Sequence, residues 1–241
     1  MPSRPASISH LKVTWLGHSA FKFETPREKI VLIDPWLENP KAPLGAKEMP
    51  KVDLILVTHG HGDHLGNTVE IAQRTGATVV CIFDLSVFLQ SKGVKTVQGM
   101  NKGGTMSIDG ISISMVDAKH SSDIDTGGTL SPGGEAAGYV VEFENGLRVY
   151  HAGDTSVFGD MKIIAEIYKP DVAILPIGDY FTMGPKEAAY ACGLLKPKRI
   201  IGMHYGTFKV LTGTPAELKK LLPPRLKNRL LELEPGKTVT L

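Results

Sequence analysis

Short apolar runs, rich in β-branched and aliphatic residues, recur through the first half of the chain and are broken by turn residues. Such runs predict strands, and two segments between them have the spacing of helices. We expect strands at residues 11–16, 20–24, 29–33, 53–58, 78–83, 94–97, 106–108 and 111–116, and helices at residues 67–75 and 85–91. The pair Asp109-Gly110 predicts a tight hairpin between the last two strands.

The second half of the chain repeats this pattern. Strands expected at residues 138–143 and 147–150 flank Asn145-Gly146, and helices then alternate with strands. We expect strands at residues 171–177 and 199–203, helices at residues 161–168 and 185–195, and a last helix that begins at the capping box Thr214-Pro215-Ala216-Glu217. Runs of strands followed by interleaved helices predict two sheets that helices cover on the outside.

Length and composition describe a globular chain. Its 241 residues, 42% of them hydrophobic, suffice for one sizeable core or two small ones. Glycines and prolines are spread along the chain without a low-complexity segment, and no linker divides it. We therefore expect one domain that spans residues 1–241.

The charge balance narrows the range of partners. A net charge of +2 without a run of like charges gives no footprint for nucleic acid or an anionic membrane. No apolar stretch is long enough for a membrane span, and residues 1–5 lack the apolar segment of a signal peptide. Cys81 and Cys192 give no disulfide framework. We expect a cytoplasmic protein, and leave its oligomeric state open.

Three histidines and one aspartate occur within six residues: His59, His61, Asp63 and His64. They follow directly on the strand expected at residues 53–58, so a rigid sheet would present them at its edge. Crowded imidazoles would repel one another on protonation, whereas imidazole with carboxylate is a usual ligand set for zinc-type ions. The run therefore predicts a metal site, although Asp63 alone would also suit a loop turn.

One ion takes about four ligands, so further ligands are expected at other strand ends. His120, Asp154 and His204 each follow an expected strand. Each also has a plainer interpretation: His120 would suit a solvated loop, and Asp154 would suit the start of a helix before Thr155. His151 is expected to lie in the core or behind the ligands.

The pattern His59-x-His61-x-Asp63-His64 resembles the HxHxDH signature of the metallo-β-lactamase superfamily. Further segments resemble a small stand-alone branch of metal-dependent hydrolases that is similar to the ascorbate-6-phosphate lactonase group. They are Leu32-Ile33-Asp34-Pro35-Trp36, Leu16-Gly17-His18-Ser19, Tyr150-His151-Ala152-Gly153-Asp154-Thr155 and Pro176-Ile177-Gly178-Asp179. The resemblance covers residues 11–241, and implies an α/β (α+β) fold, the αββα four-layer sandwich, with the site between the sheets at one edge.

The resemblance also implies how the ligands are divided. His59, His61 and His120 would hold one metal ion; Asp63, His64 and His204 would hold the other; and Asp154 would bridge them. His18 lies in a segment typical of the branch, and would orient a ligand or contact the substrate.

Two divalent ions with two aspartates and a bridging hydroxide leave the site at about +1, which favours an anionic or carbonyl-bearing substrate. A water bridging two ions becomes a nucleophile near neutral pH, and Asp63 would orient it or pass on a proton. We therefore expect an enzyme, a dinuclear metal-dependent hydrolase of a small anionic ester, lactone or phosphoester. Zinc suits the histidine-rich set best, and manganese, iron or nickel fit the same geometry.

Other functions remain open at this point. A phosphodiesterase or nuclease would use the same metals, but the balanced charge argues against a nucleic-acid substrate. A metal-binding protein without catalysis would be expected to have lost some of the seven ligands.

Two loops and three lysines are candidates for the surroundings of the site. Residues 121–137, with four glycines, are expected to form a lid over the substrate. Residues 178–184 should line the same edge, where their aromatics would contact substrate or close the end of the sheet. Lys102, Lys119 and Lys186 are candidate anion contacts.

Overall fold

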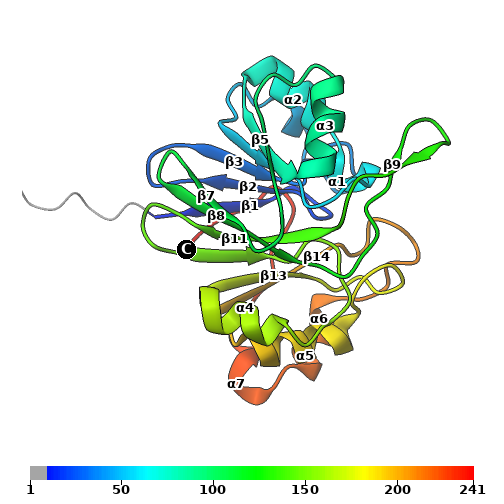
Figure 1. Ribbon diagram of the computed structural model, residues 1–241. Coiled ribbons are helices and arrows are strands. Elements are labelled where there is room, and N and C mark those ends of the chain that lie inside the picture. Colours follow the sequence, from blue (N-terminus) through cyan, green and yellow to red (C-terminus); the bar gives the residue numbers. More distant parts are fainter. Residues whose placement is uncertain (1–9) are drawn as a thin grey trace, which may run out of the picture.

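Two seven-stranded sheets lie face to face in the computed structural model, which describes residues 10–241 (Figure 1). In spatial order the first sheet contains β16 (Thr238–Thr240), β1 (Lys12–Trp15), β2 (Phe21–Glu24), β3 (Ile30–Ile33), β4 (Leu54–Leu56), β5 (Thr78–Ile82) and β6 (Val97–Met100). The second contains β15 (Leu230–Leu231), β14 (Arg199–Met203), β13 (Val172–Pro176), β12 (Arg148–His151), β11 (Ala137–Glu142), β8 (Ile111–Asp117) and β7 (Thr105–Ile108).

The two sheets are built alike. Strands β3 to β6 pair in parallel in the first sheet, and strands β12 to β15 do so in the second. The other neighbouring strands pair antiparallel. The carboxyl ends of parallel strands share one edge of a sheet, so the loops that follow β13 and β14 leave the second sheet at the same edge. Residues of the loop that follows β4 in the first sheet line the same cavity as residues of these two loops.

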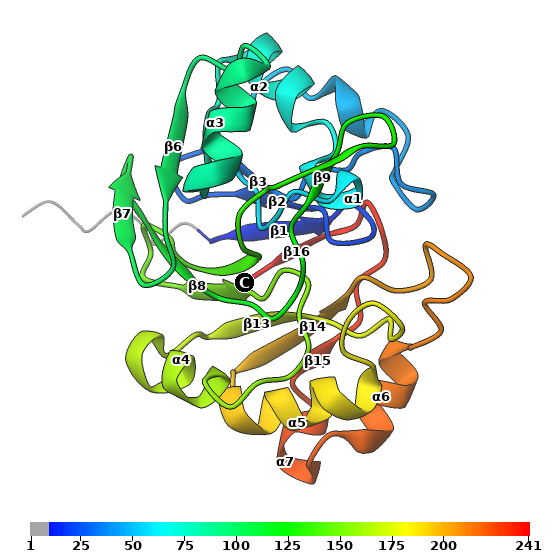
Figure 2. The same ribbon diagram turned by 45° about the vertical axis from the view of Figure 1, so that its right-hand side comes forward.

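Helices cover the outer faces, as the strand and helix pattern predicts (Figures 1 and 2). The first sheet carries α1 (Gly62–Leu65), α2 (Thr68–Thr75) and α3 (Phe83–Ser91), and a short 3₁₀ helix (Ala46–Glu48) precedes β4. The second sheet carries α4 (Met161–Tyr168), α5 (Pro185–Leu195), α6 (Pro215–Leu221) and α7 (Pro224–Lys227). The expected αββα layering is confirmed.

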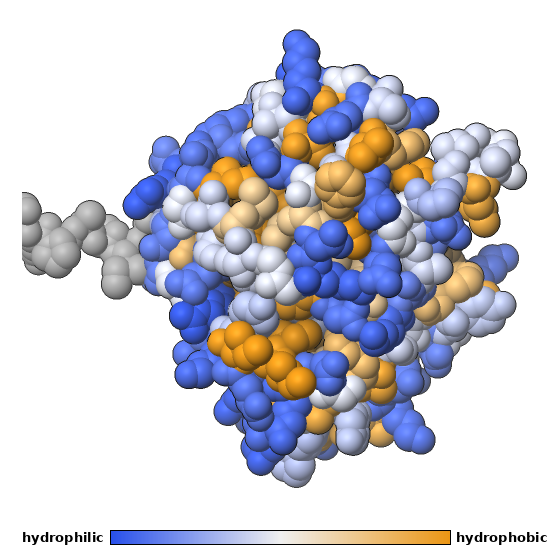
Figure 3. All heavy atoms as spheres, viewed as in Figure 1, coloured by the Kyte–Doolittle hydropathy of each residue, from blue (hydrophilic) through white to orange (hydrophobic). Residues whose placement is uncertain are grey.

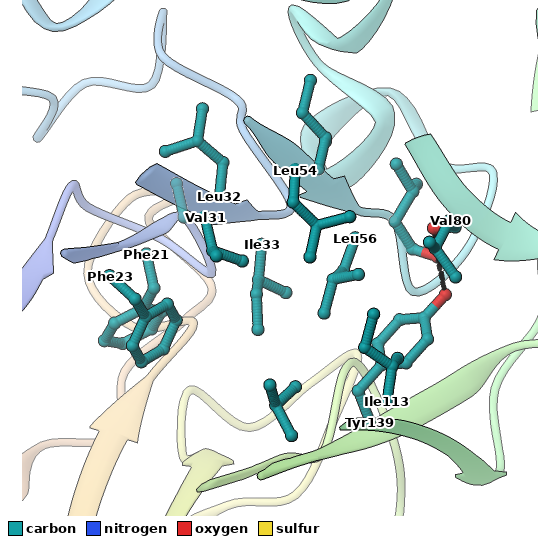
Figure 4. Packing of buried hydrophobic residues seen from close by; sticks show 14 of the residues in the cluster. Phe21, Phe23, Val31, Leu32, Ile33, Leu54, Leu56, Val80, Ile113 and Tyr139 are labelled. Carbon is teal, nitrogen blue, oxygen red and sulfur yellow. Dashed lines mark hydrogen bonds between the residues drawn. The ribbon is translucent and has the colours of Figure 1, made fainter. Parts of the chain in front are cut away.

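Apolar side chains from both sheets meet in the core between them (Figure 4). Phe21 and Ile33 of the first sheet and Ile113 of the second are fully buried there. Tyr139 on β11 crosses this core, and its hydroxyl donates to the carbonyl of Val57 at 2.8 Å. A second core lies between the second sheet and its helices. Apolar side chains also gather on the surface over α4, where Ile163 and Ile167 are at least half exposed (Figure 3).

Several local expectations were wrong. The strand expected at residues 94–97 begins only at Val97, because Val94 instead donates its backbone N–H to Leu89 and closes α3. The capping box at Thr214 is present, but the helix it begins is not the last, because Pro224 begins α7. Short strands β15 and β16, and a hairpin of β9 (Ile124–Asp125) and β10 (Leu130–Ser131), were not expected from the sequence.

The hairpin at Asp109-Gly110 is confirmed. Asp109 and Gly110 have φ values of 52° and 87°, as a tight two-residue turn requires, and β7 pairs antiparallel with β8. Within residues 10–241, no helix combines the length and apolar character that crossing a bilayer would take. Residues 1–5, from which we expect no signal peptide, lie outside the described part.

Candidate metal centre

The loop between β4 and α1 brings the histidine run to the edge of the first sheet. His59 and His64 are fully buried, while His61 precedes the first turn of α1 with extended backbone. Gly60 approaches the second half of the chain so closely that a Cβ would lie 2.6 Å from the carbonyl oxygen of Ser122. Its backbone N–H donates to Ser122 Oγ at 3.1 Å. Glycine therefore lets this loop pack tightly against the loop that follows β8.

The first group of ligand atoms is all imidazole. His59, His61 and His120 each offer a ring nitrogen, and these atoms lie within 4.8 Å of one another. His59 Nε2 and His61 Nδ1 are 3.0 Å apart. Burial lowers the pKa of all three side chains, so each ring is neutral near pH 7, as a metal ligand must be.

The second group contains Asp63, His64 and His204, and it also includes His18. His204 follows β14 in the left-handed region, at φ 55°, and its Nε2 lies 4.0 Å from Asp63 Oδ2. His18 Nε2 lies 3.1 Å from that same oxygen. Asp63 keeps 26% of its side chain exposed, so this group is accessible from outside the fold.

Asp154 lies between the two groups. Its Oδ2 is 3.0 Å from His204 Nε2, 3.3 Å from His64 Nε2 and 3.6 Å from His120 Nε2. Within residues 10–241, its Oδ1 and His64 Nε2 are buried without a hydrogen-bond partner. A carboxylate with three imidazole nitrogens around one oxygen and its other oxygen unpaired suits a shared metal ligand.

Asp34 orients the buried side of the centre. Its backbone is in the left-handed region at φ 48°, and its side chain is fully buried. Thr58 donates its backbone N–H at 2.8 Å and its hydroxyl at 2.7 Å to the carboxylate, which also bonds to His64 Nδ1 at 2.8 Å. A carboxylate on one ring nitrogen leaves the other nitrogen aimed at the metal, so Asp34 sets the direction of His64 Nε2.

The electrostatics favour positive charge in the middle of the site. Burial lowers the pKa of His64, but the carboxylates of Asp154 and Asp34 outweigh this effect and raise that pKa well above its usual value. Burial raises the pKa of Asp154, yet His204 and His64 outweigh it and hold the pKa well below its usual value. Divalent ions satisfy the same preference, and the imidazole and carboxylate donors suit them. The residues present therefore fit a metal centre.

The remaining two histidines, His151 and His18, have different roles. His151 bonds to the carbonyl of Ser19 at 3.1 Å and accepts from the N–H of Gly153, so it serves the core, as expected. His18 bonds to Thr207 Oγ1 at 2.6 Å through Nδ1 and to Asp63 through Nε2. It is therefore placed to orient Asp63.

A cavity of about 720 Å³ opens beside these residues. His61, Asp63, His120, Asp154 and His204 form its polar floor; Gly62, Ser121, Phe181, Phe208 and Val210 also line it. The loops that follow β13 and β14 reach this side of the molecule, beside α1 (Figure 2). Phe181 therefore bears out the expectation that residues 178–184 line the edge.

The expected lid and anion contacts are not found at the cavity. Of residues 121–137 only Ser121 lines it, and the β9–β10 hairpin projects from the body of the molecule instead (Figure 1). Lys102 and Lys119 pair with Asp117, and Lys186 borders a different cavity. Two of the three lysines are thus engaged by a carboxylate at the end of β8, which their positions in the sequence do not reveal.

Sequence reasoning missed several residues around the centre. Asp34 was recognised only as part of a segment, and its bond to His64 depends on how two strands pair. Thr207 and Phe208 carried no signal, because their contacts follow from the turn after His204.

The site can be compared with known proteins. A model of the Beta-lactamase superfamily domain matches residues 29–205. A UPF0173 metal-dependent hydrolase from Koribacter versatilis is 52% identical over 232 residues, covering 96% of this chain and 98% of the relative. One from Methanopyrus kandleri is 50% identical over 230 residues, covering 95% and 99%. The solved structure of Igni18, a metallo hydrolase from the archaeon Ignicoccus hospitalis, has a TM-score of 0.86 and 37% identity, covering 97% of this chain and 99% of that chain.

Proposed function

Because the chain belongs to the UPF0173 metal-dependent hydrolases of the metallo-β-lactamase superfamily, we propose that it hydrolyses a small ester, lactone or phosphoester at a two-metal centre. The enzyme class and the fold expected from the HxHxDH motif are confirmed by these relatives. The number of ions, their identity and the substrate are our proposals.

The observation that carries the two-metal proposal is the position of Asp154. Its carboxylate touches imidazoles of both ligand groups, and one of its oxygens has no hydrogen-bond partner within residues 10–241. One group would consist of His59, His61 and His120. The other would consist of Asp63, His64 and His204. A single ion would leave one of these sets without a role, which supports two ions, with zinc the best match to the donors.

Bound divalent ions would supply a nucleophile from water at neutral pH and polarise the carbonyl or phosphoryl oxygen. The chain itself contributes orientation. Asp63 lines the cavity and its Oδ2 is held by His18 Nε2, so this carboxylate is fixed where it can accept a hydrogen bond from the attacking water. Thr207 fixes His18 from the other side, at Nδ1.

The proposed charge of the site, about +1, favours a substrate whose reacting group is anionic or carries a carbonyl. Phosphodiester cleavage is the alternative within this class, since it needs the same ions and the same floor. We propose no nucleic-acid substrate, since the chain has a net charge of only +2.

Metal analysis of the purified protein, together with hydrolysis assays of lactones, carboxylic esters and bis-p-nitrophenyl phosphate, tests the proposal. We expect about two divalent ions per chain, and for His61→Ala a loss of at least one ion with activity reduced by at least about a hundredfold. His10→Ala is the matched control, since His10 is exposed and lies outside the centre.

Less than one ion per chain, with His61→Ala as active as wild type, would contradict the hydrolase proposal. Turnover of the phosphodiester without turnover of esters or lactones would select the alternative.

A further inference from the structure

Three apolar side chains complete the cavity whose floor is the metal centre. Phe181 lies in the loop that follows β13, and Phe208 and Val210 lie in the loop that follows β14. Phe181 is 54% exposed, Phe208 38% and Val210 40%. We call these three residues the apolar wall. Exposed apolar side chains gathered beside a polar site mark a surface that binds a ligand.

Phe208 is fixed by packing. Its ring stacks on Trp36, with 5.8 Å between ring centroids and 24° between the ring planes, and meets His18 edge-on at 5.6 Å. The neighbouring Thr207 hydroxyl is bonded to His18. Phe208 therefore belongs to the same packed unit as the residues that orient Asp63.

Phe181 is presented by a strained loop. Asp179 and Tyr180 have φ values of 70° and 63°, a region that costs L residues free energy. The loop is held there by Asp179 N–H donating to Met183 O at 3.1 Å and Phe181 N–H donating to Asp179 O at 2.8 Å. Such strain persists at positions where the resulting geometry is used.

In the described part of the chain, no cationic side chain lies beside the apolar wall in the cavity. Among residues 10–241, no lysine or arginine lines the cavity, and Lys209, although it stands between Phe208 and Val210 in sequence, is not a lining residue. A phosphate or carboxylate held away from the ions would find no cationic side chain there. An apolar group that packs against these three apolar side chains would lose its contact with water, which is favourable.

We propose that the substrate carries an aromatic or branched aliphatic group next to the bond that is cleaved. This group packs against the apolar wall, while the carbonyl or phosphoryl oxygen reaches the polar floor. The inference rests on the proposed function, because it takes the floor as the place of hydrolysis.

Binding of two hydroxamates to the zinc-loaded protein, measured by calorimetry, tests the inference without an activity assay. Acetohydroxamate and benzohydroxamate share the metal-binding group and differ only in a methyl or a phenyl substituent. We expect wild type to bind benzohydroxamate at least about tenfold more tightly. Phe181→Ala and Phe208→Ala should each lose about threefold or more of this preference, and for Phe181→Ala the acetohydroxamate affinity should stay unchanged.

Two control variants distinguish an effect of the apolar wall from a general effect of substitution. Tyr190→Ala removes an exposed aromatic ring on α5, and Lys209→Ala removes the adjacent cation; both should keep the wild-type preference. Should Phe208→Ala fail to fold, Phe208→Leu and the more exposed Phe181→Ala carry the test.

A preference that the wall variants leave unchanged would overturn the inference while the proposed function stands. A zinc-loaded protein that binds neither hydroxamate would overturn both, because the ions would then not be open to ligands.

Discussion

Asp34 holds several groups of the centre in place through one side chain. It combines a left-handed backbone, complete burial and bonds to both Thr58 and His64. A residue held in this way contributes to the direction of a ligand without touching the ion.

For Asp34→Asn we expect metal affinity to fall by about tenfold to a hundredfold, because the amide binds the His64 ring more weakly and admits the wrong tautomer. Titration with a competing chelator measures this change. Asp160→Asn, at an exposed aspartate, should match wild type, and equal affinity in both variants would contradict the role of Asp34.

Single residues were predictable from the sequence where they stand at strand ends. The ligand candidates follow strands whose apolar pattern is plain, and the structure brings all seven of them together. Phe208 and Thr207 could not be found in the same way, because a turn with left-handed backbone at His204 and Gly206 redirects the chain toward the cavity.

At the scale of elements, the loops that follow β13 and β14 depend on each other. Gly178 packs against the backbone of His204, so closely that a Cβ would lie 2.0 Å from its carbonyl oxygen. The position of a candidate ligand therefore depends on a glycine in a neighbouring loop.

For Gly178→Ala we expect a loss of about 2 kcal/mol or more in the free energy of unfolding, and at least one bound ion fewer, since His204 must move. Gly193→Ala is the matched control: a Cβ at this position in α5 meets no atom within 4 Å, and alanine should stabilise the helix by about 0.5–1 kcal/mol. Urea unfolding and metal analysis measure both effects, and a Gly178→Ala protein with wild-type stability would contradict the packing argument.

Elements with a long apolar run or a clear cap were predicted well, while short ones were not. Two-residue strands such as β9 and β15 have no periodicity to detect, and their existence depends on a partner. The glycines of residues 121–137 are typical of an irregular loop, so the sequence did not predict the hairpin.

At the scale of the whole molecule, burial of neutral histidines couples stability to pH. Burial lowers the pKa of His18 to about 4, whereas an unfolded imidazole titrates near 6.5. Below pH 6.5 the unfolded chain therefore binds a proton that the folded chain does not, and stability falls. Burial lowers the pKa in the same direction for His59, His61, His120 and His151.

We expect chelator-treated protein to lose at least about 2 kcal/mol between pH 7 and pH 5, the contribution of His18 alone. The raised pKa of His64 offsets only a small part of this loss, since its stabilisation is already close to its maximum at pH 7 and reaches that maximum below pH 6.5. The depressed pKa of Asp154 matters only in stronger acid. Urea unfolding at both pH values measures the difference, and equal stability would contradict it.

Tyr139 lies where the two sheets meet, and its hydroxyl on β11 reaches the carbonyls of Val57 and Val80 in the opposite sheet (Figure 4). Burial raises the pKa of this phenol well above its usual value, so the donor does not ionise. Val57 is two residues from His59, so this hydrogen bond helps to fix the distance between the two sheets beside the candidate ligands. The spacing of the two sheets beside His59 is therefore set by contacts within the protein as well as by any ion that binds there.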